Sequence, residues 1–255
     1  MGFAFSILFY GGYSIARFGS IGAGPSGAAA ATAESLVAQG CCALAGFLLA
    51  TWVIGVRVLH LSARDLRWRA AGRRGFPAGL VLGAAAALVS LLLAVPAGGG
   101  WSADAGTLGD YLGRVALTLV ALAAPAMAEE VAFRGVPLVL LSRALGRWTG
   151  VITLAALFAL AHIFNPGVTP FALTNILFAG VLLGTAFFAP GGIWTAFGAH
   201  LGWNVALAAA DAPVSGLPFA IPFIDHHAGT PAWLTGGAFG PEGGLTATLA
   251  IAAAV

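Results

Sequence analysis

Residues 126–135, AMAEEVAFRG, place two glutamates and an arginine inside a long apolar run. Charged residues make up only 8% of the chain, whereas hydrophobic residues make up 60%. A composition this apolar is typical of a protein that lies in lipid. An ionisable side chain inside a membrane span is costly, so its default interpretation is functional. The segment therefore predicts both a membrane fold and a site within it.

Further apolar stretches approach the length of about 20 residues that a bilayer core requires. We expect helices at 35–56, 76–95, 112–141, 148–164, 171–188 and 193–210, and a last one that starts near Leu245. The stretch 3–16 is either a first span or an interfacial helix. The predicted fold is all-α, a polytopic transmembrane helical bundle with about 7–8 spans.

The arginines indicate how the chain is organised. Six of them lie in the connection after residue 56, which the positive-inside rule assigns to the cytoplasm: Arg57, Arg64, Arg67, Arg69, Arg73 and Arg74. We expect N-terminal helices with this loop in 1–111, a catalytic core in 112–210, and an outer loop with a final helix in 211–255. The Gly/Pro-rich stretch 211–244 is interpreted as a solvated loop that contains Asp225, His226, His227 and Glu242.

Helical geometry separates the two glutamates of the opening segment. Glu130 and Arg134 are four residues apart with the acid first, the favourable order for an intrahelical ion pair. Glu129 points about 100° around the helix from Glu130 and has no counter-charge in its own turn. We therefore predict a structural pair and one functional carboxylate.

Two other apolar stretches contain polar residues. His162 follows Phe158 by four residues in FALAH, and His200 and Asn204 are four apart in HLGWN. Counted from the expected cytoplasmic helix ends, Glu129 and these polar residues all lie roughly 10–20 Å deep, at about 1.5 Å per residue. Three separate helices are thus expected to place polar groups in one layer.

Such a layer can activate water. A carboxylate beside an imidazole can act as a general base on a water molecule. His200 and Asn204 could donate hydrogen bonds to the oxyanion that forms on a carbonyl. This chemistry is peptide-bond hydrolysis without a covalent nucleophile.

The segments EEVAFR, FALAH and HLGWN resemble the motifs EExxxR, FxxxH and HxxxN of the CPBP (Abi) intramembrane proteases, which include CAAX proteases and bacteriocin-processing proteins. The resemblance covers about residues 112–210 and implies a helical membrane endopeptidase. By motif position, Glu129 and His162 would activate water, and His200 and Asn204 would form the oxyanion hole. Supporting roles fall to Glu130, Arg134 and Phe158.

The expected partners are membrane lipids and a protein or peptide substrate, with no nucleic acid. The expected location is a bacterial inner membrane, with the active site open toward the cytoplasm.

Several alternatives remain open. Glu129, His162 and His200 could instead hold Zn²⁺, but no HExxH motif occurs and the metal-free mechanism is favoured. GPSG at 24–27 matches the rhomboid GxSG pattern and carries little weight. Asn175 is expected to tie helices together. A non-catalytic immunity or scaffolding protein of the same fold is the second functional hypothesis, and a transporter, which would predict internal repeats, is the third.

Overall fold

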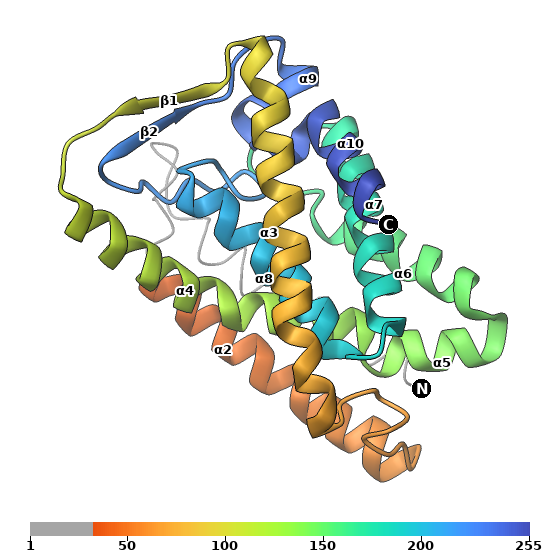
Figure 1. Ribbon diagram of the computed structural model, residues 1–255. Coiled ribbons are helices and arrows are strands. Elements are labelled where there is room, and N and C mark those ends of the chain that lie inside the picture. Colours follow the sequence, from red (N-terminus) through yellow and green to blue (C-terminus); the bar gives the residue numbers. More distant parts are fainter. Residues whose placement is uncertain (1–32) are drawn as a thin grey trace.

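The apolar stretches form helices that pack beside one long upright helix, α3 (Figure 1). The computed structural model describes residues 33–255, and the protein is 72% helical. The stretches 3–16 and 24–27 lie outside the described residues. The longer helices are α2 (Ala33–Ala50), α3 (Gly75–Ala94), α4 (Leu108–Arg134), α5 (Val136–Leu145), α6 (Arg147–Ala161), α7 (Pro170–Phe188), α8 (Ile193–Ala209) and α10 (Leu245–Ala254).

The main departure from the expected helices occurs at Gly135, where the predicted helix 112–141 is divided into α4 and α5. Pro137 follows in the first turn of α5, and proline lacks the N–H that would continue the helix. The EExxxR segment therefore forms the last turns of α4. Helix α2 continues at its C-terminal end as a π-helix, η1 (Thr51–Val58).

The helical class is confirmed, whereas the number of membrane spans is not. Within residues 33–255, four helical stretches are long and apolar enough to cross a membrane: Leu36–Val58, Gly72–Ala97, Leu108–Leu145 and Pro170–Phe188. The apolar helices α6 and α10 are shorter. At about 1.5 Å per residue they extend only about 22 and 15 Å, less than the bilayer core of about 30 Å.

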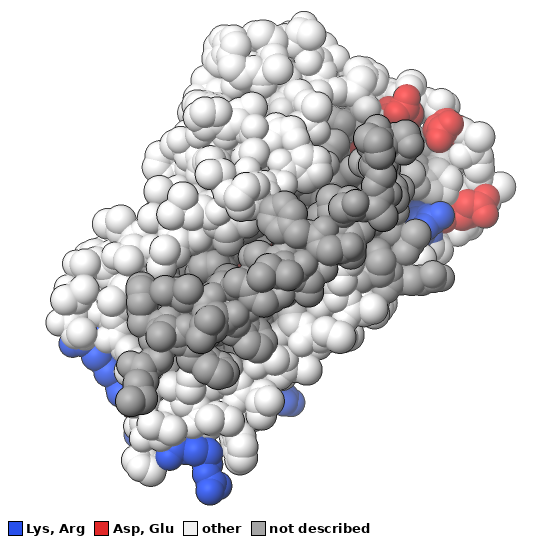
Figure 2. All heavy atoms as spheres, turned by 180° about the vertical axis from the view of Figure 1, so that it is seen from behind, with Lys and Arg blue, Asp and Glu red and all other residues white. Residues whose placement is uncertain are grey.

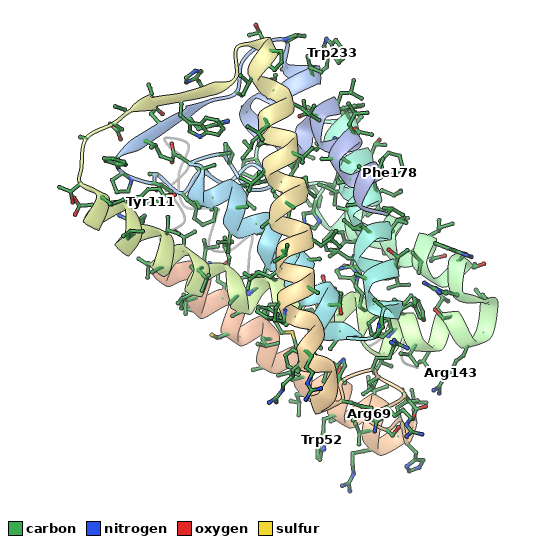
Figure 3. The ribbon with its side chains drawn as sticks, in the orientation of Figure 1. Trp52, Arg69, Tyr111, Arg143, Phe178 and Trp233 are labelled. Carbon is green, nitrogen blue, oxygen red and sulfur yellow. The ribbon has the colours of Figure 1, made fainter. Side chains whose placement is uncertain are left out.

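The surface has the pattern of an integral membrane protein. Apolar side chains such as Leu49, Val81 and Leu92 are exposed by 60% or more. Trp52 and Trp233 are also exposed and lie at opposite ends of the molecule, with Arg69 and Arg143 at the Trp52 end (Figure 3). In the view of Figure 2, most basic groups gather at one end and the acidic groups at the other. Tryptophans at both ends of an apolar body are typical of the two membrane interfaces.

Helices α3 and α8 pack backbone to backbone through glycines. A Cβ atom on Gly79 or Gly83 of α3 would overlap carbonyl oxygens of α8, and one on Gly198 or Gly202 of α8 would overlap carbonyl oxygens of α3. In both helices the glycines are four residues apart, the spacing that lets membrane helices approach closely. Because α8 contains His200 and Asn204, this contact helps to position the predicted site.

Substitution of Gly83 by alanine should therefore loosen α8. The added methyl group must displace the backbone at Ala199, and we expect a loss of about 1–3 kcal/mol in unfolding free energy. Thermal unfolding in detergent measures this effect. Gly113→Ala in α4 is the matched control, because a Cβ there would meet no atom within 4 Å. Equal stability of the two variants would contradict the packing role of Gly83.

The stretch 211–244 is not the solvated loop that its composition suggests. It contains the strand β2 (Ile224–His227), which pairs antiparallel with β1 (Gly100–Ala103), and the short helix α9 (Ala232–Thr235). Two 3-10 turns follow, η4 (Gly237–Phe239) and η5 (Pro241–Gly243). The side chains that anchor the stretch are buried: Ala212, Val214, Ile221 and Phe239. We call residues 211–244 the outer cap.

The arginine-rich connection also has internal contacts. The Arg67 guanidinium donates hydrogen bonds to three carbonyl oxygens at the end of α7, those of Phe187 (2.8 Å), Phe188 (3.1 Å) and Ala189 (2.6 Å). A cation there is favoured by the helix dipole and by the unpaired carbonyls of the last turn. This arginine stabilises α7, in addition to any role of the cluster in orientation.

Candidate active site

Three helices supply the predicted site residues. Glu129, Glu130 and Arg134 lie in the last turns of α4, and His200 and Asn204 lie in α8. Helix α4 starts at a capping box, in which Thr107 and Asp110 bond each other's backbone N–H groups. The third helix is α6, and its C-terminal cap is His162. We predicted this histidine inside a longer helix, but α6 ends one residue earlier.

A buried charge cluster forms the base of the site. The Oε1 atom of Glu130 accepts a hydrogen bond from Arg134 Nη1 (3.0 Å), and His200 Nδ1 lies 2.8 Å from the same oxygen. Arg134 also donates to the Gly180 carbonyl of α7 (3.3 Å). Glu130 and Arg134 are 0% and 1% exposed. The predicted pair is confirmed, and its link to His200, which the sequence did not indicate, joins α4 to α8.

Glu129 lies apart from this cluster. Its side chain is 27% exposed, and its Oε2 atom is 3.8 Å from His200 Nε2. The imidazole of His200 therefore lies between two carboxylates, one on each nitrogen. Unlike Glu130, Glu129 forms no ion pair with Arg134 among the described contacts, which leaves its carboxylate available to a small molecule such as water.

Phe158 connects the aromatic and charged groups. The Arg134 guanidinium lies over its ring at 4.4 Å from the centroid. The His162 ring lies 4.7 Å from the Phe158 ring, and the His200 ring contacts it edge to face at 6.0 Å. A ring face beside a guanidinium is favourable. The supporting role predicted for Phe158 is consistent with this position.

Three of the four predicted catalytic residues, His162, His200 and Asn204, line one open cavity of about 50 Å³, whereas Glu129 is not among its lining residues. Its polar lining comes from His162, His200, Asn204, Ser215 and Glu242, and its apolar lining includes Ile176, Leu182, Leu183 and Ile251. His162 directs Nδ1 to its own helix, 2.7 Å from the Phe158 carbonyl oxygen. A carbonyl only accepts, so Nδ1 carries a proton and Nε2 remains for other partners.

Glu242 is the site residue that the sequence analysis missed. Its place in a Gly-rich stretch suggested solvent exposure, but it is partly buried and lines the cavity beside the predicted residues. Burial raises the pKa of its carboxyl group, while hydrogen bonds from Ser215 and the charge of His162 oppose that rise. The only feature of the sequence that could have pointed to Glu242 is its ionisable side chain in a chain with few charged residues.

Asp225, His226 and His227 lie in β2 and not in a solvated loop. The His226 ring lies 5.7 Å from the ring of Trp101 in β1, and its backbone N–H donates to Asp211 (3.3 Å). The ring contact and the strand pairing hold the outer cap to β1, and the bond to Asp211 lies within the cap. Within the described chain, no three His, Cys, Asp or Glu residues are arranged to hold a metal ion.

The zinc alternative has Glu129, His162 and His200 as ligands. Zinc requires its ligand atoms at about 2.0–2.2 Å from one point. Glu129 Oε2 and His200 Nε2 lie 3.8 Å apart, and His162 keeps its Nε2 for other partners. Within residues 33–255, however, no three His, Cys, Asp or Glu side chains are placed to hold a metal ion.

Comparison with known families supports the interpretation of the motifs. Residues 111–206 match the family model of Type II CAAX prenyl endopeptidase Rce1-like proteins, and this range contains all three motifs. Residues 111–206 are therefore similar to the Rce1-like family. The resemblance to the CPBP proteases is thus confirmed. No curated protein and no solved structure matches the chain.

The Rce1-like core contains α4 through most of α8 and thus the charge cluster and much of the cavity wall. The family indicates CAAX-type intramembrane endopeptidase activity. The outer cap, with Ser215 and Glu242, lies beyond the Rce1-like match.

Proposed function

We propose that the protein is an endopeptidase that hydrolyses peptide bonds of lipidated or membrane-associated proteins within the membrane. The observation that supports this most is the approach of the Glu129 carboxylate to His200, next to the cavity that His162, His200 and Asn204 line. The apolar walls of the cavity suit a lipidated or hydrophobic substrate.

In the proposed mechanism, Glu129 and His162 activate a water molecule. Glu129 takes a proton from the water, as general base, while the water oxygen bonds to the substrate carbonyl carbon. The carbonyl oxygen then carries negative charge. When the C–N bond breaks, the stored proton passes to the leaving nitrogen, so the products are a carboxylic acid and an amine.

His200 and Asn204 stabilise the oxyanion in this mechanism. Since His200 Nδ1–H donates a hydrogen bond to the Glu130 carboxylate, Nε2 can also donate only when His200 is an imidazolium. That form balances the charges, because Glu129, Glu130, Arg134 and a protonated His200 sum to zero. The Asn204 amide provides a second donor.

Substitution of Asn204 by alanine should lower kcat by about 10²–10³-fold with little change in KM, because the lost donor acts mainly in the transition state. Initial rates of peptide release measure both constants. Ser90→Ala is the control, since the buried Ser90 hydroxyl donates to Thr246 Oγ1 (3.2 Å) and does not line the cavity. A wild-type kcat for Asn204→Ala would refute the oxyanion role.

The proposed orientation places the arginine-rich connection in the cytoplasm of a bacterial inner membrane, with the site open toward that side. It follows from the positive-inside rule and agrees with the separation of charges along the molecule (Figure 2). The expected partners are anionic lipids at the arginines and a protein or peptide substrate.

The experiment that tests the proposal compares membrane proteomes of cells that express the wild type or Glu129→Gln. New protein termini that depend on Glu129 identify a protease and its substrates. If the cellular phenotype is the same in both strains and no termini differ, the non-catalytic immunity or scaffolding hypothesis replaces the proposal. Metal analysis of the purified protein tests the zinc alternative, since stoichiometric zinc would overturn the metal-free mechanism.

A further inference from the structure

Glu242 is the ionisable cavity residue to which the proposed mechanism assigns no task. It comes from η5 in the outer cap and lines the same cavity as His162, His200 and Asn204. It lies outside residues 111–206, so the family match does not cover it.

The two oxygens of Glu242 join the outer cap to α8. Oε1 accepts a hydrogen bond from Trp203 Nε1 (3.1 Å). Oε2 accepts from the Ser215 backbone N–H and from Ser215 Oγ (3.0 Å). Trp203 directly precedes Asn204 in α8. The carboxylate therefore fixes the turn of α8 that carries the proposed oxyanion donor.

The backbone on either side of Glu242 is itself held by α7. Asn175 Nδ2 donates to the carbonyl oxygens of Glu242 and Gly244, both at 2.8 Å, and Asn175 Oδ1 accepts from Thr248 Oγ1 of α10 (2.6 Å). The prediction that Asn175 ties helices together is confirmed. With backbone and carboxylate both held, Glu242 is preorganised at the cavity wall.

No fixed cation balances this carboxylate. The helices and turns packed against η5 are α3, α7, α9, η4 and α10, and none contains an ionisable residue. The titratable groups that face Glu242 are thus His162 and His200 across the cavity. No Lys or Arg forms an ion pair with it among the described residues.

We propose that Glu242 is a positioning residue of the active site, which holds the outer cap against α8 beside Asn204. This proposal rests on the proposed protease function. Its consequence is a fixed geometry for the oxyanion donor.

The test uses Glu242→Gln in the full-length protein, in liposomes, with a farnesylated peptide that ends in a CAAX sequence. Gln keeps the shape but turns one acceptor into a donor, so either Trp203 or Ser215 loses its bond. We expect kcat to fall by about 10- to 100-fold with a smaller change in KM.

Two further variants separate positioning from folding. Glu242→Asp keeps the two acceptor oxygens and should recover part of the lost kcat. Asp211→Asn removes a different carboxylate of the outer cap, one that accepts hydrogen bonds from the Ile221 and His226 backbones and does not line the cavity. It should leave kcat and KM close to the wild-type values. If Glu242→Gln lowers kcat no more than Asp211→Asn, or if Glu242→Asp is as impaired as Glu242→Gln, the proposal is overturned.

Hydrogen–deuterium exchange supplies a measurement that does not depend on activity. Glu242→Gln should speed exchange in peptides that cover 203–217 and 238–244, whereas Asp211→Asn should speed it only near 221–226. Wild-type exchange in Glu242→Gln overturns the proposal even if no peptide is cleaved. If the wild type releases no tripeptide in a Glu129-dependent way while exchange changes as expected, the CAAX substrate class fails and the structural link of Glu242 to α8 stands.

Discussion

Glu129→Gln is expected to abolish peptide hydrolysis and leave the fold intact. The substitution keeps the size of the side chain and removes the proposed general base, whose contribution is typically about 10²–10⁴-fold. Stability should change by less than about 1 kcal/mol, because Glu129 is partly exposed and its one described ionic contact is at 3.8 Å. Rates of peptide release and thermal unfolding in detergent give the two quantities.

The neighbouring residue provides the matched comparison. Glu130→Gln should lose activity by a different route, because it leaves Arg134 buried without its counter-charge and therefore destabilises the fold. A lower unfolding temperature is expected for Glu130→Gln and not for Glu129→Gln. If both variants unfold like the wild type and Glu129→Gln still hydrolyses peptide at the normal rate, the division between a functional and a structural glutamate is wrong.

Local spacing explains why much of the site could be predicted. Residues four apart share a helix face, so the pairing of Glu130 with Arg134 and the common face of His200 and Asn204 followed from the sequence alone. The lengths of the apolar stretches likewise predicted the ends of most helices to within a few residues. These features depend on periodicity within one element, and periodicity is visible in a single sequence.

The features that were missed depend on contacts between distant segments. The bond of His200 to Glu130 joins residues 70 positions apart, and Glu242 reaches the cavity only because the outer cap folds back over α8. Composition suggested a solvated loop there, since Gly and Pro favour turns, but turns can also pack against a core. The glycines at spacings of four in α3 and α8 are visible in the sequence and are typical of close helix packing, but the partner of each helix is not.

The buried charge cluster leads to the largest expected effect on stability. Arg134→Met removes the guanidinium bonded to Glu130 and leaves a carboxylate that is 0% exposed. Breaking a buried pair from one side typically costs about 3–5 kcal/mol. Arg143→Met is the control, because its partner Asp65 is at the surface and an exposed pair contributes less than about 1 kcal/mol. Unfolding in detergent should separate the two arginines clearly.

A double variant shows what the cluster is for. Removing both charges, as Glu130→Gln with Arg134→Met, should recover much of the lost stability, because neutral residues of similar volume often replace a buried pair without loss. Gln can still accept from His200 Nδ1, but the local charges no longer favour an imidazolium there. We therefore expect a folded protein with little activity. Full activity in the double variant would show that the cluster does not support His200. If Arg134→Met were as stable as Arg143→Met, the ion pair of Glu130 with Arg134 would not be needed for the fold.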